Sequence, residues 1–451
     1  MKNIHDLIPG GAHTYSKGDD QFPENAPKFI KRGEGCILWG SNNKKYIDLT
    51  MSLGTVLLGH SYQPVLEAVK KELNKGVNFC RPSLIEGKLA EILNFHIPSA
   101  EMVKFGKHGS DAVSGAIKLA RAYTGRSYIV RCQQDPFNSV HDWFIGSTIV
   151  DRGIPNEVKK LTLKFEYNNI ENCKEIFEQY PNQIACFVLE PYSFISPNDY
   201  CKKFNHSNNN KVTCSCDQNS CKSDFLEDLK KLCEKNGSLL IFDEVVSGFR
   251  YDIGGVQKLI NVKPHLSAFG KAMANGFSVS ALVGQKEFMK LGGIKHENEK
   301  VFLMSSTHGG ETHSIAAAIK TIQSIDELNL INHFWSVGEY FQKQLKKIII
   351  ETKSENIIEI KGFYVKPVIQ FKDFENYSAS LIRTFFLQET INQGILMPYV
   401  VPSFAHDKAT FDKVVEGSRI SLLKIMNSIK NNRVKNDLNS PIIKPVFRKY
   451  N

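Results

Sequence analysis

Residues 238–276 read SLLIFDEVVSGFRYDIGGVQKLINVKPHLSAFGKAMANG, and they contain the clearest indication of the architecture. The apolar run LLIF is followed directly by Asp243 and Glu244, and Lys271 lies further on, among glycines and alanines. A short apolar run that ends in charged residues predicts a buried strand. In an open parallel sheet, functional groups collect where the strands end, so Asp243 is expected at such a carboxyl end.

The length and composition are those of an ordinary globular protein. The chain has 451 residues, of which 42% are hydrophobic and 23% are charged, which excludes disorder throughout and allows two domains or one large domain with an appendage. The formal net charge is +10, and much of the excess lies near the C-terminus. The basic residues there are Lys430, Arg433, Lys435, Lys444, Arg448 and Lys449. We interpret them as a solvated tail and predict no nucleic-acid partner.

The N-terminal stretch MKNIHDLIPGG lacks the apolar core of a secretory signal, and no run is long enough to cross a bilayer. We therefore predict no membrane association and a cytoplasmic location.

Most of the ten cysteines are expected to be small apolar fillers in a reducing compartment. A denser polar stretch holds four of them, with His206 between: Cys201, Cys214, Cys216 and Cys221. Their spacing matches no paired C-x2-C pattern, so a metal site and a surface insertion with incidental thiols both stay open, and no metal is assigned.

Strand-like and helix-like segments alternate along the chain, which predicts an α/β fold with a mainly parallel sheet. Residues 36–50 predict a hairpin, 63–76 an amphipathic helix, and 103–125 a strand, a glycine turn and a helix. Further strands are expected in SYIVRC, IACFVLEP, SLLIFDEV and ALVGQ, and a helix in SDFLEDLKKLCEKNG with Ser223 as N-cap. Long helices and strands near FYVKPVIQF follow residue 320, and they favour a second, smaller domain. The predicted division is residues 1–60, an N-terminal part of the small domain; 61–322, the large domain; 323–435, the C-terminal small domain; and 436–451, an extended tail.

Three features in the predicted large domain point to one cofactor. The turn HGSDAVSGAIKLAR places the backbone N–H groups of Gly109 and Ser110 at a helix N-terminus, which is an anion site. Asp243 at a strand end requires a cation, and Lys271 offers a primary amine. Taken alone, such an Asp is more often a salt-bridge partner or a helix cap, and such a Lys a surface charge. Together they match pyridoxal 5′-phosphate, which requires amides for its phosphate, a carboxylate for its ring nitrogen and a lysine for its aldehyde.

Across residues 8 to 420 the sequence resembles the class III aminotransferases of the pyridoxal-phosphate fold type I, and most of all the glutamate-1-semialdehyde 2,1-aminomutases. The segments that carry the resemblance occur in the family's order: LIPGGAHTYSKG, HGSDAVSGAIKLARAYTG, FNSVHDWF, ACFVLEP, IFDEVVSGFR, AFGKAMANGF, SSTHGGETHSIAAA and PSFAH. The resemblance implies a large domain with a mostly parallel central sheet and a smaller α+β domain built from the two chain ends. It also implies a homodimer with the active site at its interface.

The resemblance further implies roles for two catalytic residues. Lys271 would form the internal aldimine with the cofactor and then move a proton between the substrate carbon and the cofactor. Asp243 would pair with the pyridinium nitrogen, and Val245 would pack against one face of the ring.

Five other residues would complete the cofactor site. Gly109 and Ser110 would hold the phosphate, helped by Thr307 of the neighbouring subunit. Phe137 lies where the family stacks an aromatic ring, and Glu190 matches the family's strand-end glutamate. Phe137 as a core residue and Thr307 as a turn residue are the simpler alternatives.

The sequence departs from the family pattern at several positions. The aromatic-His-Gly segment becomes Phe137-Asn138-Ser139. Where the aminomutases carry Asn-Ser-Pro-Val-Arg, this chain has His-Thr-Tyr-Ser-Lys, so Ser16 and Lys17 are the expected substrate residues. Lysine cannot form the bidentate hydrogen bonds of arginine with a carboxylate, and this argues against glutamate 1-semialdehyde as the substrate.

The sequence therefore predicts a pyridoxal-phosphate-dependent aminotransferase, which moves an amino group from an amino acid donor to an aldehyde or ketone acceptor through pyridoxamine phosphate. A 2,1-aminomutase is one alternative, and a pyridoxal-phosphate-binding subunit without turnover is another. A nicotinamide-dependent dehydrogenase is not favoured, because no Gly-x-Gly-x-x-Gly turn follows the first strand.

Overall fold

The computed structural model describes residues 3–192 and 225–450. The chain forms two compact units: unit 1 comprises residues 1–53, 58–62 and 333–451, and unit 2 comprises residues 54–57 and 63–332. The domain boundaries expected from the sequence, at residues 60 and 322, stay a prediction. The cysteine cluster and Ser223 lie outside the described residues.

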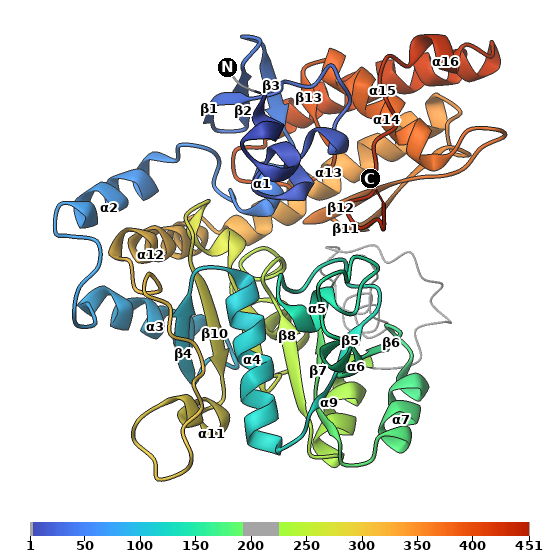
Figure 1. Ribbon diagram of the computed structural model, residues 1–451. Helices are drawn as coiled ribbons and strands as arrows, with labels where there is room; N and C mark the ends of the chain where they lie inside the picture. The colour runs from blue at the N-terminus through green and yellow to red at the C-terminus, as the bar shows by residue number, and fades with distance from the viewer. Residues whose placement is uncertain (1–2, 193–224, 451) are drawn as a thin grey trace. The chain divides into compact units, whose positions relative to one another are not determined.

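A seven-stranded sheet forms the centre of unit 2, in the order β4-β10-β9-β8-β7-β5-β6 (Figure 1). Strand β10 is antiparallel to both of its neighbours, and the other strands run in one direction. The predicted α/β fold with a mainly parallel sheet is therefore confirmed. The strands are β4 (Met102–Gly106), β5 (Tyr128–Cys132), β6 (Thr162–Phe165), β7 (Ile184–Leu189), β8 (Leu239–Asp243), β9 (Leu266–Phe269) and β10 (Ser280–Gly284).

Helices pack on this sheet, and α4 (Gly109–Thr124) contacts β4, β10, β9, β8 and β7. Small residues line its buried face, and Gly125 ends it in the left-handed conformation that glycine adopts without strain. The other helices of unit 2 are α2 (Gln63–Leu73), α3 (Leu84–His96), α5 (Asp142–Ile145), α6 (Asn156–Lys160), α7 (Ile170–Gln179), α9 (Phe225–Lys235), α10 (Val256–Ile260), α11 (Lys286–Met289) and α12 (Thr312–Glu327), with the short turns η5 (Lys271–Ala274) and η6 (Lys290–Gly292).

Two strands of the sheet were not expected from the sequence. Strands β6 and β9 have only four residues each, and β9 is the polar-interrupted run LSAF. Such short runs carry too little periodicity to be recognised alone, and it is the pairing with β5 and β8 that orders them. Strand β9 matters most, since it leads directly to Lys271.

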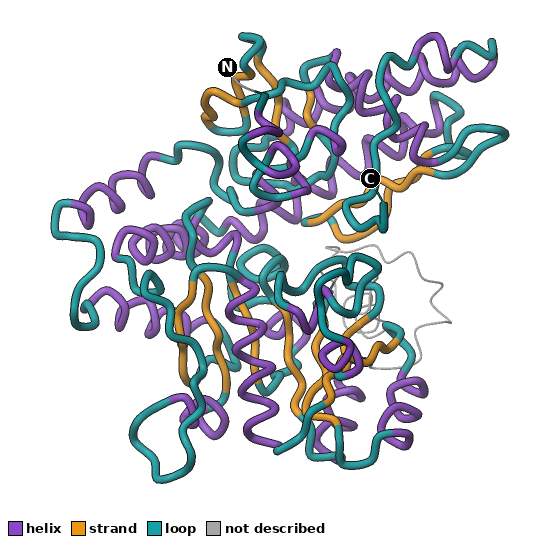
Figure 2. Tube along the Cα trace, viewed as in Figure 1, coloured by secondary structure: helices purple, strands orange, loops and turns teal. Residues whose placement is uncertain are grey.

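Unit 1 combines a small sheet, a hairpin and long helices (Figure 2). The sheet order is β1-β2-β3-β13, and the expected hairpin at 36–50 is formed by β2 and β3. Strands β11 and β12 pair as a second hairpin, and α14 and α15 pack on each other around an apolar core. The elements are η1 (Ile4–Asp6), η2 (Pro9–Gly11), η3 (Tyr15–Lys17), η4 (Asp19–Gln21), β1 (Ile30–Glu34), β2 (Ile37–Gly40), β3 (Lys45–Asp48), α1 (Met51–Gly54), α13 (Leu330–Glu351), β11 (Ile358–Phe363), β12 (Lys366–Phe371), α14 (Ala379–Asn392), β13 (Ile395–Leu396), α15 (Lys408–Lys430) and α16 (Val434–Asp437).

The C-terminal tail after α16 has no helix or strand, and its basic side chains are exposed or half-buried, but one apolar side chain in it is buried. Ile443 is only 4% exposed, and its N–H donates to Thr384 Oγ1 over 3.1 Å. The N–H of Lys444 donates to the carbonyl of Asp20 over 3.0 Å. The tail is thus part of unit 1, because an apolar side chain anchors it despite the surrounding charges.

The described helices and cysteines agree with a chain that has no apolar membrane-spanning helix and mostly buried thiols. No helix in the described ranges is both long and apolar enough to cross a bilayer. The six described cysteines are free thiols, and five are buried, as expected for apolar fillers.

Candidate active site

Strands β8 and β9 bring Asp243 and Lys271 together. The two strands are parallel neighbours, with Asp243 paired to Ala268, and Lys271 lies three residues further along the second strand's exit. Both residues therefore sit at the carboxyl edge of the sheet, Asp243 at the end of β8 and Lys271 just after the end of β9. Their charges interact: burial and the charge of Glu190 raise the pKa of the Asp243 carboxyl, and the Lys271 ammonium weakly opposes this.

Asp243 is a buried carboxyl group with two hydrogen-bond donors. Its Oδ1 accepts from the N–H of Val245 over 3.1 Å and its Oδ2 from Asn138 Nδ2 over 3.0 Å. Burial, followed by the charge of Glu190, raises the pKa of Asp243 to about 7 in spite of these donors. A carboxyl group so placed is strongly favoured as an anion when a cation lies beside it.

Glu244, the next residue, has a structural role. Its carboxylate is fully buried and accepts hydrogen bonds from Ser247 Oγ at 2.5 Å and from the N–H groups of Val256 at 2.9 Å and Gln257 at 3.0 Å. These N–H groups belong to the first turn of α10, so Glu244 caps that helix. The two adjacent acids in the quoted stretch thus face different surroundings, because successive side chains of a strand point in opposite directions.

The turn between β4 and α4 lies beside the same edge. A Cβ atom on Gly109 would come within 2.6 Å of both methyl groups of Val245, so only glycine fits there. Ser110 is buried, and its Oγ accepts from the N–H of Val140 over 3.2 Å. The first N–H groups of α4 have no partner within the helix and can bind an anion.

Strands β7 and β5 add two more acids, of which the sequence indicated only Glu190. Glu190 follows β7, and its N–H donates to Asp135 Oδ2 over 2.8 Å. Asp135 follows β5 and is 4% exposed. The local sequence does not identify Asp135 as a site residue. It is the sheet order β8-β7-β5 that places Asp135 near Asp243.

The remaining expected cofactor residues are more exposed. Phe137 is 40% exposed and meets Phe144 edge-on, with ring centroids 5.6 Å apart. Thr307 is exposed, and its carbonyl accepts from Asn78 Nδ2 over 2.9 Å. Ser280, which the sequence did not indicate, begins β10 at this edge, and among the described residues its buried Oγ has no hydrogen-bond partner.

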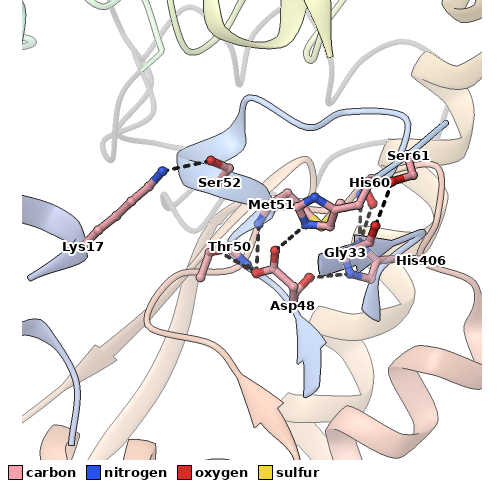
Figure 3. Close-up of polar contacts among 10 residues, drawn as sticks. Lys17, Gly33, Asp48, Thr50, Met51, Ser52, His60, Ser61 and His406 are labelled. Carbon is pink, nitrogen blue, oxygen red and sulfur yellow. Dashed lines mark hydrogen bonds and ion pairs between the residues drawn. The ribbon is translucent and has the colours of Figure 1, made fainter. Parts of the chain in front are cut away.

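The expected substrate residues belong to unit 1. Lys17 Nζ donates to Ser52 Oγ over 3.2 Å, as Figure 3 shows. The carbonyl of Ser16 accepts from the Tyr399 hydroxyl at 3.5 Å. Asp243 and Lys271 belong to unit 2.

The sheet edge in unit 2 fits pyridoxal phosphate. The missing side chain at Gly109 lets Val245 pack against the start of α4, whose first N–H groups have no partner within the helix. The unpartnered Ser280 hydroxyl can still form a hydrogen bond, and the buried Asp243 carboxyl requires a cation. The phosphate, the hydroxyl and the protonated ring nitrogen of the cofactor supply these partners. The described residues hold no cluster of potential metal ligands.

A solved structure gives the class of fold. The chain is similar to the PLP internal aldimine form of the FumI protein from Sphingopyxis sp. MTA144, with a TM-score of 0.79, 22% identity, and coverage of 98% of this chain and 97% of that one. At this level of identity the similarity establishes the fold. The predicted pyridoxal-phosphate fold type I is therefore confirmed.

Sequence comparisons then give the family. The family model for class III aminotransferases matches residues 20–194 and 218–416. The chain is 30% identical to glutamate-1-semialdehyde 2,1-aminomutase from Sulfurihydrogenibium sp. (strain YO3AOP1), covering 83% of this chain and 85% of the relative. It is 31% identical to 3-aminobutyryl-CoA aminotransferase from Cloacimonas acidaminovorans (strain Evry), covering 93% and 94%. The chain belongs to the class III aminotransferase family, and the predictions of an enzyme with pyridoxal phosphate as cofactor are confirmed at the level of that family.

Proposed function

We propose that the chain transfers an amino group from an amino acid donor to an aldehyde or ketone acceptor, with Lys271 and Asp243 as its catalytic residues. The observation that supports these roles is their placement at the carboxyl ends of the adjacent parallel strands β8 and β9. Pyridoxal phosphate, when bound, supplies an aldehyde that accepts the amino group and a ring that delocalises negative charge.

Side chains of the chain would transfer the proton, pair with the ring nitrogen and support the ring. The Lys271 amine would take a proton from the substrate carbon that carries the amino group and deliver it to the former aldehyde carbon of the cofactor. The Asp243 carboxylate holds the proton on the ring nitrogen, and its burial strengthens that attraction. Val245 would support one ring face, and it already packs against Gly109 at the start of α4.

Phosphate binding is assigned to the first turn of α4. Gly109 offers its N–H, and Ser110 offers its N–H and a hydroxyl that can still donate, since the bond to Val140 uses it as an acceptor. We further assign Phe137 to the second ring face, Glu190 to the cofactor's surroundings, and Thr307 to the phosphate of the neighbouring subunit.

The choice between aminotransferase and aminomutase depends on Lys17. Lys17 replaces the arginine that we associate with the substrate carboxylate in the aminomutases, and its Nζ is held by Ser52. A single ammonium group binds a carboxylate without the two parallel hydrogen bonds of arginine. This favours the aminotransferase, while the 30% identity to an aminomutase keeps that activity as the second candidate.

The homodimer and the cytoplasmic location also belong to the proposal. The dimer is supported by large apolar side chains of unit 2 that lie open to solvent. They include Leu84 at 90%, Phe95 at 82%, Ile294 at 83% and Phe302 at 69% exposure. The cytoplasmic location is supported by the free thiols.

The test is to mix the holoenzyme with single amino donors and to follow its visible absorbance. The panel holds alanine, glutamate, 3-aminobutyryl-CoA and glutamate 1-semialdehyde. We expect one donor to bleach the band and to release a carbonyl product in a one-to-one ratio with the bleached sites. Conversion of glutamate 1-semialdehyde to an isomer, with no second product, would instead establish the aminomutase.

A further inference from the structure

Asp135 is a buried acid with a specific set of contacts. Its Oδ2 accepts from the N–H of Glu190 over 2.8 Å and from Asn138 Nδ2 over 3.4 Å. Its Oδ1 is buried and has no hydrogen-bond donor among the described residues. A buried oxygen without a donor costs more free energy when the group is a charged carboxylate than when it is a neutral carboxyl group.

Asn138 connects Asp135 to the proposed catalytic acid. The same Nδ2 that lies near Asp135 donates to Asp243 Oδ2 over 3.0 Å. Asn138 is 3% exposed, and its Oδ1 has no partner among the described residues. Asp135 therefore fixes which side of the amide faces Asp243.

The charges around Asp135 favour its neutral form. Glu190 and Asp243 face it from β7 and β8, and both raise its pKa, after burial as the main cause. On the neighbouring strand β5, the buried Cys132 thiol and the Arg131 guanidinium also interact with Asp135. The N–H groups of Arg131, however, donate to Ser147 and to the carbonyl of Cys132 and not to the Asp135 carboxyl. No ion pair of Asp135 is found within the described residues. Beyond these, Lys271 faces Asp243, and Tyr251 faces Glu190.

We propose that Asp135 is a positioning residue that keeps a proton and orients the Asn138 amide, so that Asp243 is the acid left ionised toward the cofactor's ring nitrogen. Adjacent carboxyl groups in one buried site cannot all be ionised, and Asp135, which forms no ion pair among the described residues and has one oxygen without a donor, is the one that keeps its proton. This inference rests on the proposed role of Asp243 and adds to it two residues that do not touch the reacting atoms.

The test compares four single variants of the holoenzyme: Asp135→Asn, Asp135→Ala, Asn138→Ala and, as control, Asp142→Asn. Asp142 lies in the same segment but is exposed, so its variant makes the same side-chain change at the surface. For each variant, kcat, KM and the acid limb of the pH profile of kcat/KM are measured per cofactor-loaded site, with the thermal midpoint as a check of folding.

Asp135→Asn replaces a neutral carboxyl group with a neutral amide of the same shape, so we expect kcat within about twofold of the parent enzyme and an unchanged acid limb. Asp135→Ala and Asn138→Ala should lower kcat about tenfold, or about 1.4 kcal/mol, with little change in KM. Because the Asn138 hydrogen bond lowers the pKa of Asp243, losing it raises that pKa and moves the acid limb to higher pH.

Two results would overturn the proposal. If Asp135→Asn moves the acid limb to lower pH, Asp135 is charged in the parent enzyme, because its removal then stabilises the Asp243 anion. If Asp135→Ala lowers only the thermal midpoint and leaves kcat and the acid limb unchanged, Asp135 is merely structural. A parent enzyme without the visible cofactor band would mark a failure of the proposed function itself, which keeps the two failures distinct.

Discussion

At the residue scale, the same type of side chain has different roles depending on its donors. Asp243 has two hydrogen-bond donors and a nearby lysine, whereas Glu244 is held by three donors that include the first turn of α10. Three donors give the Glu244 carboxylate a structural role. Asp243, with fewer donors, can still pair with a cationic group of a ligand.

Changing Lys271 tests the proposed attachment of the cofactor. Lys271→Ala should lose the visible absorbance of lysine-bound cofactor while pyridoxal phosphate still binds noncovalently through the α4 turn. Turnover should fall by about 10²–10⁴-fold, the usual effect of removing an acid–base group. Absorbance spectra before and after dialysis check this, and Lys263→Ala, which removes a surface ion pair with Glu101, is the control. An unchanged spectrum would remove Lys271 from the mechanism.

At the element scale, the end of β3 is held by a network around Asp48 (Figure 3). Asp48 Oδ1 accepts from the N–H groups of Thr50 and Met51, and Oδ2 lies 2.9 Å from His60 Nε2. The chain then passes through α1, where the non-glycine residues from Met51 to Leu53 have φ values of 43°, 52° and 61°. Left-handed backbone of this kind costs about 1–2 kcal/mol per residue, so the turn depends on the Asp48 hydrogen bonds.

His406 completes the network and should make stability depend on pH. Its Nδ1 accepts from the N–H of Ser403 over 3.1 Å and its Nε2 donates to the carbonyl of Asp48 over 3.0 Å, so the ring is neutral. Burial lowers the pKa of His406 from 6.5 to about 4. Between these values the unfolded chain binds one more proton than the folded chain, so stability falls as the pH drops through this window.

The expected loss from His406 is up to about 3 kcal/mol in the free energy of unfolding between pH 6.5 and 4. Urea denaturation at several pH values measures it. His406→Gln should show a weaker pH dependence than the parent, and His13→Gln, at an exposed position, should not. Equal slopes for His406→Gln and the parent would show that this ring titrates normally.

At the scale of the whole molecule, the exposed apolar side chains of unit 2 predict self-association. The double variant Leu84→Glu, Phe95→Glu should convert a dimer to a monomer, because each change places a charge in a surface that is otherwise desolvated. Activity should fall with it if Thr307 serves the neighbouring subunit. Light scattering and activity assays measure both effects, with Ile350→Glu in unit 1, which is 65% exposed in the parent, as control. A parent protein that is monomeric and active would contradict the proposal.

The sequence by itself determined the parts that depend on local pattern. The buried run before Asp243, the glycine turn at Gly109 and the small residues around Lys271 each require a particular backbone, and the family pattern followed from them. The tertiary structure alone decided which residues meet. Asp135 and Asn138 reach Asp243 from 105 to 108 positions away because β8, β7 and β5 are neighbours. Strand order is set by pairing and burial over the whole sheet, and a local sequence pattern contains neither.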